Sequence, residues 1–156
     1  MLVQLNRDQE RRPFTITETD LPLNPATTRS MSPVVALFGH PGRIAGLAER
    51  LPNGWELRRP SDLDDVRPDE IVLFAQASVH DVATARAVLP GRTRIVALVD
   101  SAAPAELVAG VLTAGADVCV RGGQPAILAS HLVACRRRQL ADRWARLQAS
   151  ALDAEG

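Results

Sequence analysis

The sequence of 156 residues contains no lysine and no tyrosine, so all eighteen basic side chains are arginines. Any mechanism that needs a lysine amine is therefore excluded. No apolar run approaches the roughly 18 residues that a membrane-spanning helix requires. The first residues mix charges with apolar side chains, unlike a signal peptide. We therefore expect a cytoplasmic protein that makes no membrane contact.

Net charge and metal-binding residue types are also scarce. Eighteen acidic residues balance the eighteen arginines, which removes a general electrostatic attraction to nucleic acid. The two cysteines, Cys119 and Cys135, are predicted to be buried thiols on a strand and a helix, and not a disulfide. The histidines His40, His80 and His131 are far apart and lack metal-ligand spacing. We expect neither a metal nor a cofactor.

Residues 1–32 are polar, carry several Thr, Asn and Pro residues, and show no sustained periodicity, so they are predicted to form an N-terminal arm. Within it, FTITET at 14–19 alternates like a short edge strand. From residue 33 the pattern becomes regular, and apolar stretches predict five strands, at 34–38, 55–59, 70–75, 94–99 and 116–120. Helical segments are expected at 42–51, 61–66, 79–89, 104–115 and from 124 toward 151.

Strands without polar alternation that alternate with helices specify a parallel sheet covered on both faces. Right-handed crossovers leave few topologies for five such units. We predict a flavodoxin-like (βα)5 three-layer sandwich with strand order 2-1-3-4-5. Its domain spans residues 33–135, followed at 136–156 by an extended C-terminal helix and tail.

Helix boundaries carry recognisable signals. Ser61 opens a Ser-x-x-Asp capping box at a segment with length for barely more than one turn. Ser78 is predicted to be the N-cap of the helix that follows it. Pro104 suits the first turn of its helix, and Gly115 suits the C-cap.

Three segments carry a resemblance to a known family. VVALFGHP lies where the family has a strand ending in two acidic residues, RPDEIVLFA matches an Arg-Pro-Asp followed by an apolar strand, and LTAGADVCVRGG matches a Leu-x-Ala-Gly-Ala segment. From about Pro33 to Ala134 the chain resembles a response-regulator receiver domain. Such domains phosphorylate an aspartate with the help of Mg²⁺, a hydroxyl and a lysine.

The resemblance implies that this phosphorylation chemistry is lost. Its positions fall on residues that cannot perform it: the acidic pair on Phe38 and Gly39, the phosphoacceptor on Phe74 or Ala75, the hydroxyl on Val99, the lysine on Gly122 or Arg121, and the switch aromatic on Cys119. The chain therefore resembles a degenerate, phosphorylation-independent pseudo-receiver, and we expect no enzyme activity.

The glycine-bearing turn after the first strand is predicted to be structural, with His40 as a turn residue. Gly39, Gly42 and Gly46 lack the spacing of a dinucleotide fingerprint, and a Walker motif would need a lysine.

Other candidate sites are weak. Ser78, His80 and Asp81 lie too close in sequence to point toward each other as a catalytic triad. Asp100 and Arg121 end neighbouring strands, and we expect them to form an ion pair that closes the degenerate pocket. The alternative is a small anionic ligand on Arg121.

The last helix is longer than a receiver needs. Leu128, Leu132 and Cys135 form a stripe suited to packing on the sheet. The run 136–138 of three arginines is expected to be a solvated face. A second stripe follows about 120° around the helix, made of Leu140, Trp144, Leu147 and Ala151. One helix cannot press both stripes on the same sheet, so we expect the second to meet another surface: a homodimer through 139–152, a partner helix or the N-terminal arm.

These observations favour a non-catalytic signalling or scaffolding module that acts by protein–protein interaction. By analogy of fold, its docking face would combine the fourth helix, the fifth strand and the fifth helix. The alternative is a ligand-sensing domain of a transcriptional regulator whose DNA-binding domain is absent from this chain. An enzyme of the same fold comes third, because no nucleophile and base pair supports it.

Overall fold

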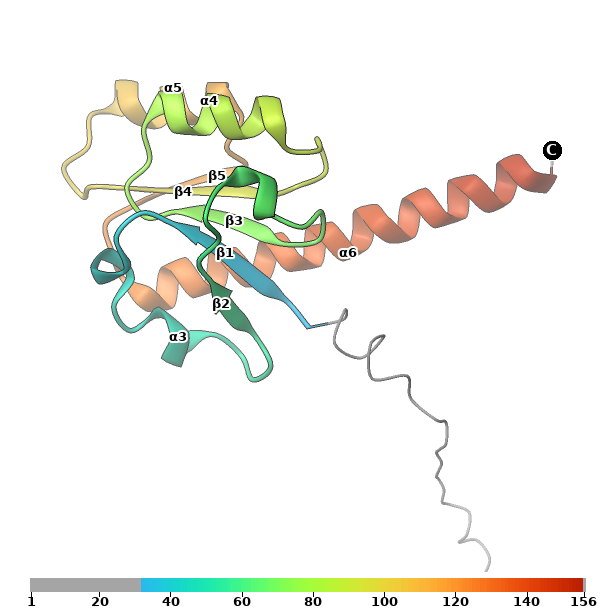
Figure 1. The fold of residues 1–156 in the computed structure, drawn as a ribbon, viewed down its shortest axis with the longest axis horizontal. Coiled ribbons are helices and arrows are strands. Elements are labelled where there is room, and N and C mark those ends of the chain that lie inside the picture. The colour runs from blue at the N-terminus through green and yellow to red at the C-terminus, as the bar shows by residue number, and fades with distance from the viewer. Residues whose placement is uncertain (1–31, 156) are drawn as a thin grey trace, which may run out of the picture. The chain divides into compact units, whose positions relative to one another are not determined.

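A five-stranded parallel sheet forms the centre of the fold (Figure 1). The computed structural model describes residues 32–155. The strands are β1 (Val34–Phe38), β2 (Glu56–Arg58), β3 (Ile71–Phe74), β4 (Ile95–Val99) and β5 (Val118–Arg121). They pair in the order β2-β1-β3-β4-β5, every pair parallel. The predicted flavodoxin-like α/β fold is confirmed.

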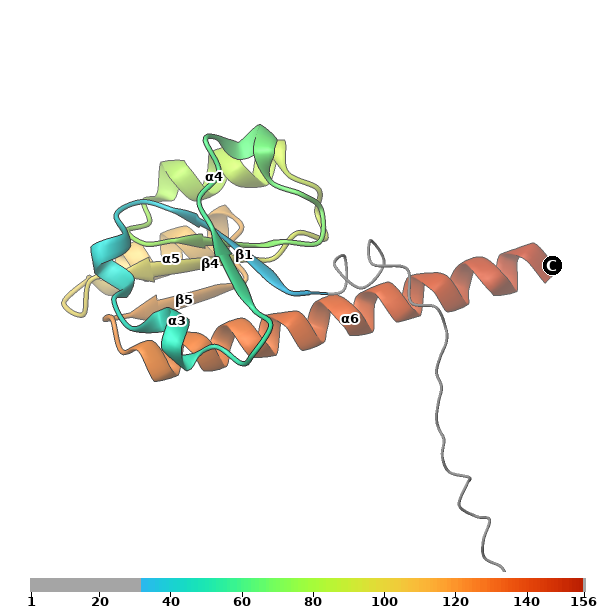
Figure 2. The same cartoon turned by 60° about the horizontal axis from the view of Figure 1, so that its bottom comes forward.

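Helices cover both faces of this sheet (Figures 1 and 2). One face carries the 3-10 turn η3 (Leu63–Asp65) with the helices α4 (Val79–Val88) and α5 (Ala105–Ala114). The other carries the 3-10 turn η2 (Pro41–Ile44) with the helices α3 (Leu47–Arg50) and α6 (Pro125–Glu155). Alternate residues of the central strands enter one of two buried clusters, one on each face. A strand buried on both faces needs apolar residues throughout, which explains the continuous apolar runs.

The helix predicted for 42–51 is wrong, because the segment is broken into η2 and α3. The break lies at Gly46, whose φ of +87° is left-handed. A Cβ at this position would lie 3.4 Å from Cγ of Pro125, so the chain also passes close to the start of α6 here. The expected apolar residues Ile44 and Leu47 are nevertheless buried. The periodicity predicted the buried face and missed the break.

Capping at the other helices follows the predictions in part. Ser78 caps α4, since its Oγ accepts a hydrogen bond from the Asp81 amide at 3.1 Å. Gly115 ends α5 with a φ of +130°, as predicted. Pro104 precedes the first turn of α5 as its N-cap residue, one position earlier than predicted. The capping box predicted at Ser61 is wrong, because the carboxylate of Asp62 caps η3 instead.

Helix α6 runs without interruption for 31 residues, through the boundary predicted at 135/136. What changes near that boundary is burial. The first stripe, Leu128, Leu132 and Cys135, is buried as predicted. Arg136 is buried too, contrary to the expected solvated arginine run, because it lies four residues after Leu132 and shares the buried face. Burial lowers the pKa of Arg136, and the nearby Asp69 carboxylate opposes that shift.

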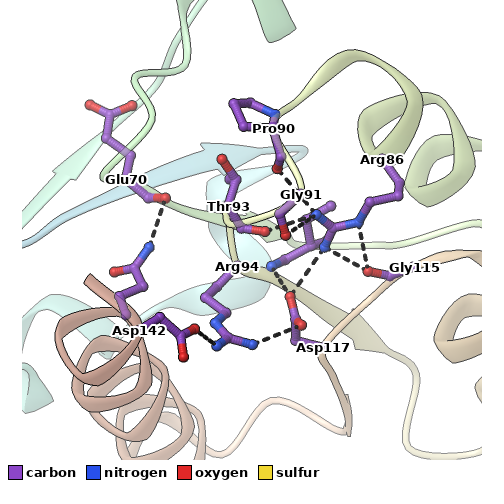
Figure 3. A network of polar contacts seen from close by, with 11 residues as sticks. Glu70, Arg86, Pro90, Gly91, Thr93, Arg94, Gly115, Asp117 and Asp142 are labelled. Carbon is purple, nitrogen blue, oxygen red and sulfur yellow. Dashed lines mark hydrogen bonds and ion pairs between the residues drawn. The ribbon is translucent and has the colours of Figure 1, made fainter. Parts of the chain in front are cut away.

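A polar network at the amino ends of β3, β4 and β5 fixes the middle of α6 (Figure 3). The Gln139 amide donates to the backbone carbonyl of Glu70 at 3.4 Å, and Arg94 pairs with Asp142. Arg94 also pairs with Asp117 at 3.2 Å. These contacts hold α6 to the sheet up to about Asp142. Beyond it the helix projects past the sheet (Figures 1 and 2), with residues 143–154 exposed.

Two further predictions concern the N-terminal arm and contact with a membrane. The arm predicted for residues 1–32, with its edge strand at 14–19, lies outside the described residues except for residue 32. Within residues 32–155, no helix is both long and apolar enough to cross a membrane.

Candidate functional site

Phe38 and Phe74, two of the positions named in the sequence analysis, lie together at the carboxyl ends of β1 and β3. Phe38 and Phe74 are register partners, and their ring centroids are 5.5 Å apart with planes tilted by 31°. Gly39 turns the chain away with a φ of +106°, and a Cβ there would lie 3.2 Å from Cβ of the buried Ala75. Apolar packing therefore fills the place where the resemblance puts the acidic pair and the phosphoacceptor.

The ion pair predicted between Asp100 and Arg121 does not form, because Asp100 pairs with Arg43. Val99 and Arg121 are register partners, so the two strand ends are adjacent. The carboxylate of Asp100, however, binds Arg43 from η2, while Arg121 is exposed. Arg43 lies in the 3-10 turn η2, where the sequence analysis predicted part of a continuous helix, and its side chain lies beside Asp100. Both paired side chains are more than a third exposed, and such surface pairs contribute only about 0–1 kcal/mol.

A pocket that the sequence analysis missed opens beside the two phenylalanines. Its volume is about 590 Å³. It lies among the carboxyl ends of β1 and β3, the turn η3 and one side of α4 along its length. Its lining residues are Phe38, Gly39, Ser61, Asp62, Leu63, Asp64, Phe74, Gln76, His80, Asp81, Thr84 and Val88. The sequence signal for this pocket is the short connection between β2 and β3. It contains only the three-residue turn η3 to cover the face of the sheet that α4 and α5 also cover.

Carboxylates dominate the charge of this pocket. Asp62 and Asp64 come from η3, and Asp81 comes from the first turn of α4. Among residues 32–155 no basic side chain forms an ion pair with any of them. One carboxylate oxygen of Asp62 accepts a hydrogen bond from the backbone amide of Asp64 at 2.9 Å. The pocket is therefore an acidic one.

The histidines and cysteines of the described part do not gather into a metal-binding group. His40 is a turn residue, as predicted, because its Nδ1 accepts a hydrogen bond from the Gly42 amide at 3.0 Å. Ser78 uses its hydroxyl to cap α4 and is not among the residues that line the pocket with His80. No three His, Cys, Asp or Glu side chains gather for a metal within 32–155.

Both cysteines have free thiols on the predicted elements, in β5 and α6. Cys135 is buried as expected, whereas Cys119 is only half-buried, because it lies on β5, the edge strand of the sheet. Burial raises the pKa of both thiols. A raised pKa lowers the fraction of reactive thiolate at neutral pH.

The second stripe of α6 is exposed along its length. The exposed fractions are 42% for Leu140, 64% for Trp144 and 56% for Leu147, and Ala151 is exposed too. Leu152 adds a further exposed apolar side chain. The stripe thus makes no extensive contact with the described residues of its own chain.

Comparison with known proteins leaves the site to be interpreted from its own residues. No protein-family model matches the sequence, and no curated protein matches it either.

Proposed function

We propose that this protein is a non-catalytic, phosphorylation-independent receiver-like module that acts by protein–protein interaction and self-associates through α6. The observation that carries the proposal is the exposed stripe of Leu140, Trp144 and Leu147, which begins near the last contacts of α6 with the sheet and continues along the projecting part of the helix. Exposed apolar patches of this kind, with a tryptophan beside leucines, are typical of interaction sites.

The spacing of the stripe suits helix pairing. Val133, Leu140 and Leu147 recur every seven residues, and Trp144 and Ala151 each follow four residues after a leucine. This is the alternation of three and four residues that places side chains along the seam of a coiled coil. A second copy of the same helix presents the same seam, so pairing of two copies buries the apolar side chains of both stripes against each other.

The expected strength of this association is moderate. Burying a large apolar side chain contributes about 1.5–3 kcal/mol. Three such side chains on each helix contribute roughly 9–18 kcal/mol if they become fully buried, and association costs about 4–15 kcal/mol. The difference includes the roughly 8 kcal/mol of a micromolar dimer, which is the affinity that we expect.

The residues at the positions where a receiver is phosphorylated support a role without catalysis. Phe38 and Phe74 offer no oxygen to Mg²⁺ and no carboxylate to a phosphoryl group. With no lysine in the chain, the charge of a phosphoryl group has no lysine partner either. We therefore expect no aspartyl phosphate after incubation with acetyl phosphate, measured by intact mass. A species heavier by one phosphoryl group and labile at high pH would contradict this part of the proposal.

Self-association is tested by light scattering on the full chain and on a Leu140→Glu, Leu147→Glu double variant. We expect a dimer for the unchanged protein at high micromolar concentration and a monomer for the variant. Circular dichroism verifies that the variant keeps its helix content. A wild-type monomer, or a variant that stays dimeric, would contradict pairing through this stripe.

A matched control uses Leu112→Glu on α5. Leu112 is 43% exposed, almost the same as Leu140, but lies on the other side of the sheet. It also belongs to the docking face that the receiver resemblance implies. We expect this variant to remain dimeric. A monomeric Leu112→Glu protein beside a dimeric α6 variant would move the interface to the α5 face.

The second candidate is a ligand-sensing domain of a transcriptional regulator, with the DNA-binding domain outside this chain. The pocket beside Phe38 and Phe74 favours it, because ligands of open α/β sheets bind at the carboxyl ends of the strands. The discriminating observation is whether the reading frame continues into a helix-turn-helix sequence.

A further inference from the structure

The pocket beside β1 and β3 has a structural cause. The sheet face that carries α4 and α5 is covered by ten-residue helices over β3 to β5. At the β2 edge the connection supplies only the three residues of η3. Leu63 of this turn packs on the cluster that includes Phe74, but three residues do not fill the space that a full helix would. The opening of about 590 Å³ is what remains.

Its position is the one where parallel sheets bind ligands. The connection after β1 passes over the face of α3, and the connection after β3 passes over the face of α4. The chain thus turns to opposite faces at neighbouring strands, which leaves a crevice at their carboxyl ends. A volume of about 590 Å³ also falls within the range of small-molecule sites, roughly 300–1,000 Å³.

The lining determines the class of ligand. Phe38 and Phe74 supply aromatic surface, and Asp62, Asp64 and Asp81 supply negative charge. The lining contains three aspartates and no arginine, and His80 is its one residue with a basic side-chain type. An anion is therefore repelled. A cation is attracted by the carboxylates and by the electron-rich faces of the rings.

We propose that this pocket binds a small organic cation that joins a flat or apolar body to an amine, amidine or guanidine group. The body lies against Phe38 and Phe74, and the charged group faces Asp64 and Asp81 on the rim. The inference deepens the ligand-sensing alternative and is independent of self-association through α6.

The test uses benzamidine, a planar aromatic cation, with benzamide and benzoate as a neutral and an anionic molecule of nearly the same shape. Each is titrated into the full chain, and the amide resonances of Gly39 and Gln76 are followed by NMR. We expect saturable binding of benzamidine that moves both resonances. We expect benzamide to bind at least about tenfold more weakly, and benzoate not to bind, because the three molecules share the ring and differ in the charge and hydrogen-bond donors of the planar substituent.

Two substitutions of equal size place the binding in the pocket. Asp64→Asn and Asp81→Asn each remove one negative charge while keeping shape, and we expect each to weaken benzamidine binding about three- to tenfold. The matched control, Asp153→Asn, removes the same charge from the far end of α6 and is expected to leave binding unchanged. Phe38→Leu is expected to weaken binding as well, because it removes one aromatic face.

Several results would overturn the inference. They are equal binding of benzamidine and benzamide, an effect of Asp153→Asn equal to that of Asp81→Asn, or no saturable change at Gly39 and Gln76. Circular dichroism of each variant separates lost binding from lost folding. Failure of this test leaves the light-scattering result on α6 unaffected, so the two proposals fail separately.

Discussion

Arg86 near the end of α4 is expected to be one of the most important polar side chains for stability (Figure 3). Its guanidinium donates to the carbonyl of Gly115 at 2.8 and 3.2 Å and to the carbonyl of Thr93 at 3.0 Å. It also pairs with Asp117 at 3.2 Å. One side chain thus joins the end of α4 to the end of α5 and to the starts of β4 and β5.

Arg86→Met keeps most of the aliphatic stem and removes every one of these donors. A hydrogen bond to a charged group contributes about 1.5–3 kcal/mol, and water reaches some of the released carbonyls because the side chain is 24% exposed. We therefore expect a loss of about 2–4 kcal/mol in the free energy of unfolding, which lowers the Tm by roughly 10 °C for a domain of this size. Arg86→Lys is expected to recover little, because an ammonium cannot reproduce the planar fork.

Differential scanning calorimetry measures both variants. The control is Arg92→Met, an exposed arginine in the loop before β4, for which we expect a change within about 0.5 kcal/mol. If Arg86→Met and Arg92→Met shift the Tm equally, the network contributes no net stability and the reasoning is refuted.

Three further predictions concern Glu70, Gly46 and Cys135. Glu70 is buried and forms a two-point ion pair with Arg58 at 2.8 and 3.0 Å, which raises the arginine pKa, so Glu70→Gln should cost about 2–4 kcal/mol in urea unfolding; a loss below about 0.5 kcal/mol would contradict this. Gly46→Ala should cost about 1–2 kcal/mol because of its left-handed φ, whereas Gly91→Ala, where a Cβ meets nothing within 4 Å, should be neutral. The pKa of Cys135 is raised by burial, so the folded state holds its proton more tightly than the unfolded state. That contribution to stability is complete below the unfolded pKa of about 8.5 and is lost as the pH rises through the folded pKa. A Cys135→Ala variant should show a smaller alkaline decline in urea midpoint, with the part due to Cys119 retained, and an identical decline in both proteins would refute it.

The predictable features of the fold are those that depend on residue type at short range. Apolar runs such as 34–38 and 94–99 are typical of strands covered on both faces, and right-handed crossovers then leave few topologies, of which the order 2-1-3-4-5 is the commonest. The cap at Ser78 and the end of α5 at Gly115 are equally local, because each depends on one side chain or its absence. The stripes of α6 could be separated for the same reason.

The candidate site was predictable only in part. The clustering of Phe38 and Phe74 follows from strand order, since neighbouring parallel strands end at the same edge. The partner of Asp100 did not follow, because Arg43 lies in the 3-10 turn η2, where a continuous helix was predicted. The left-handed Gly46 after this turn lies close to Pro125, a residue far away in the sequence. The burial of Arg136 depends likewise on how far α6 stays on the sheet.

The sequence by itself determined that this protein is a parallel α/β sandwich, that it has no lysine chemistry and that its last helix carries two apolar stripes. Periodicity and composition suffice for these features because they act within one element. Only the tertiary structure decided where α6 leaves the sheet, which charges pair, and that an acidic pocket opens between η3 and α4. These depend on distances between elements far apart in the chain, and a pocket exists only where two such elements fail to fill the space between them.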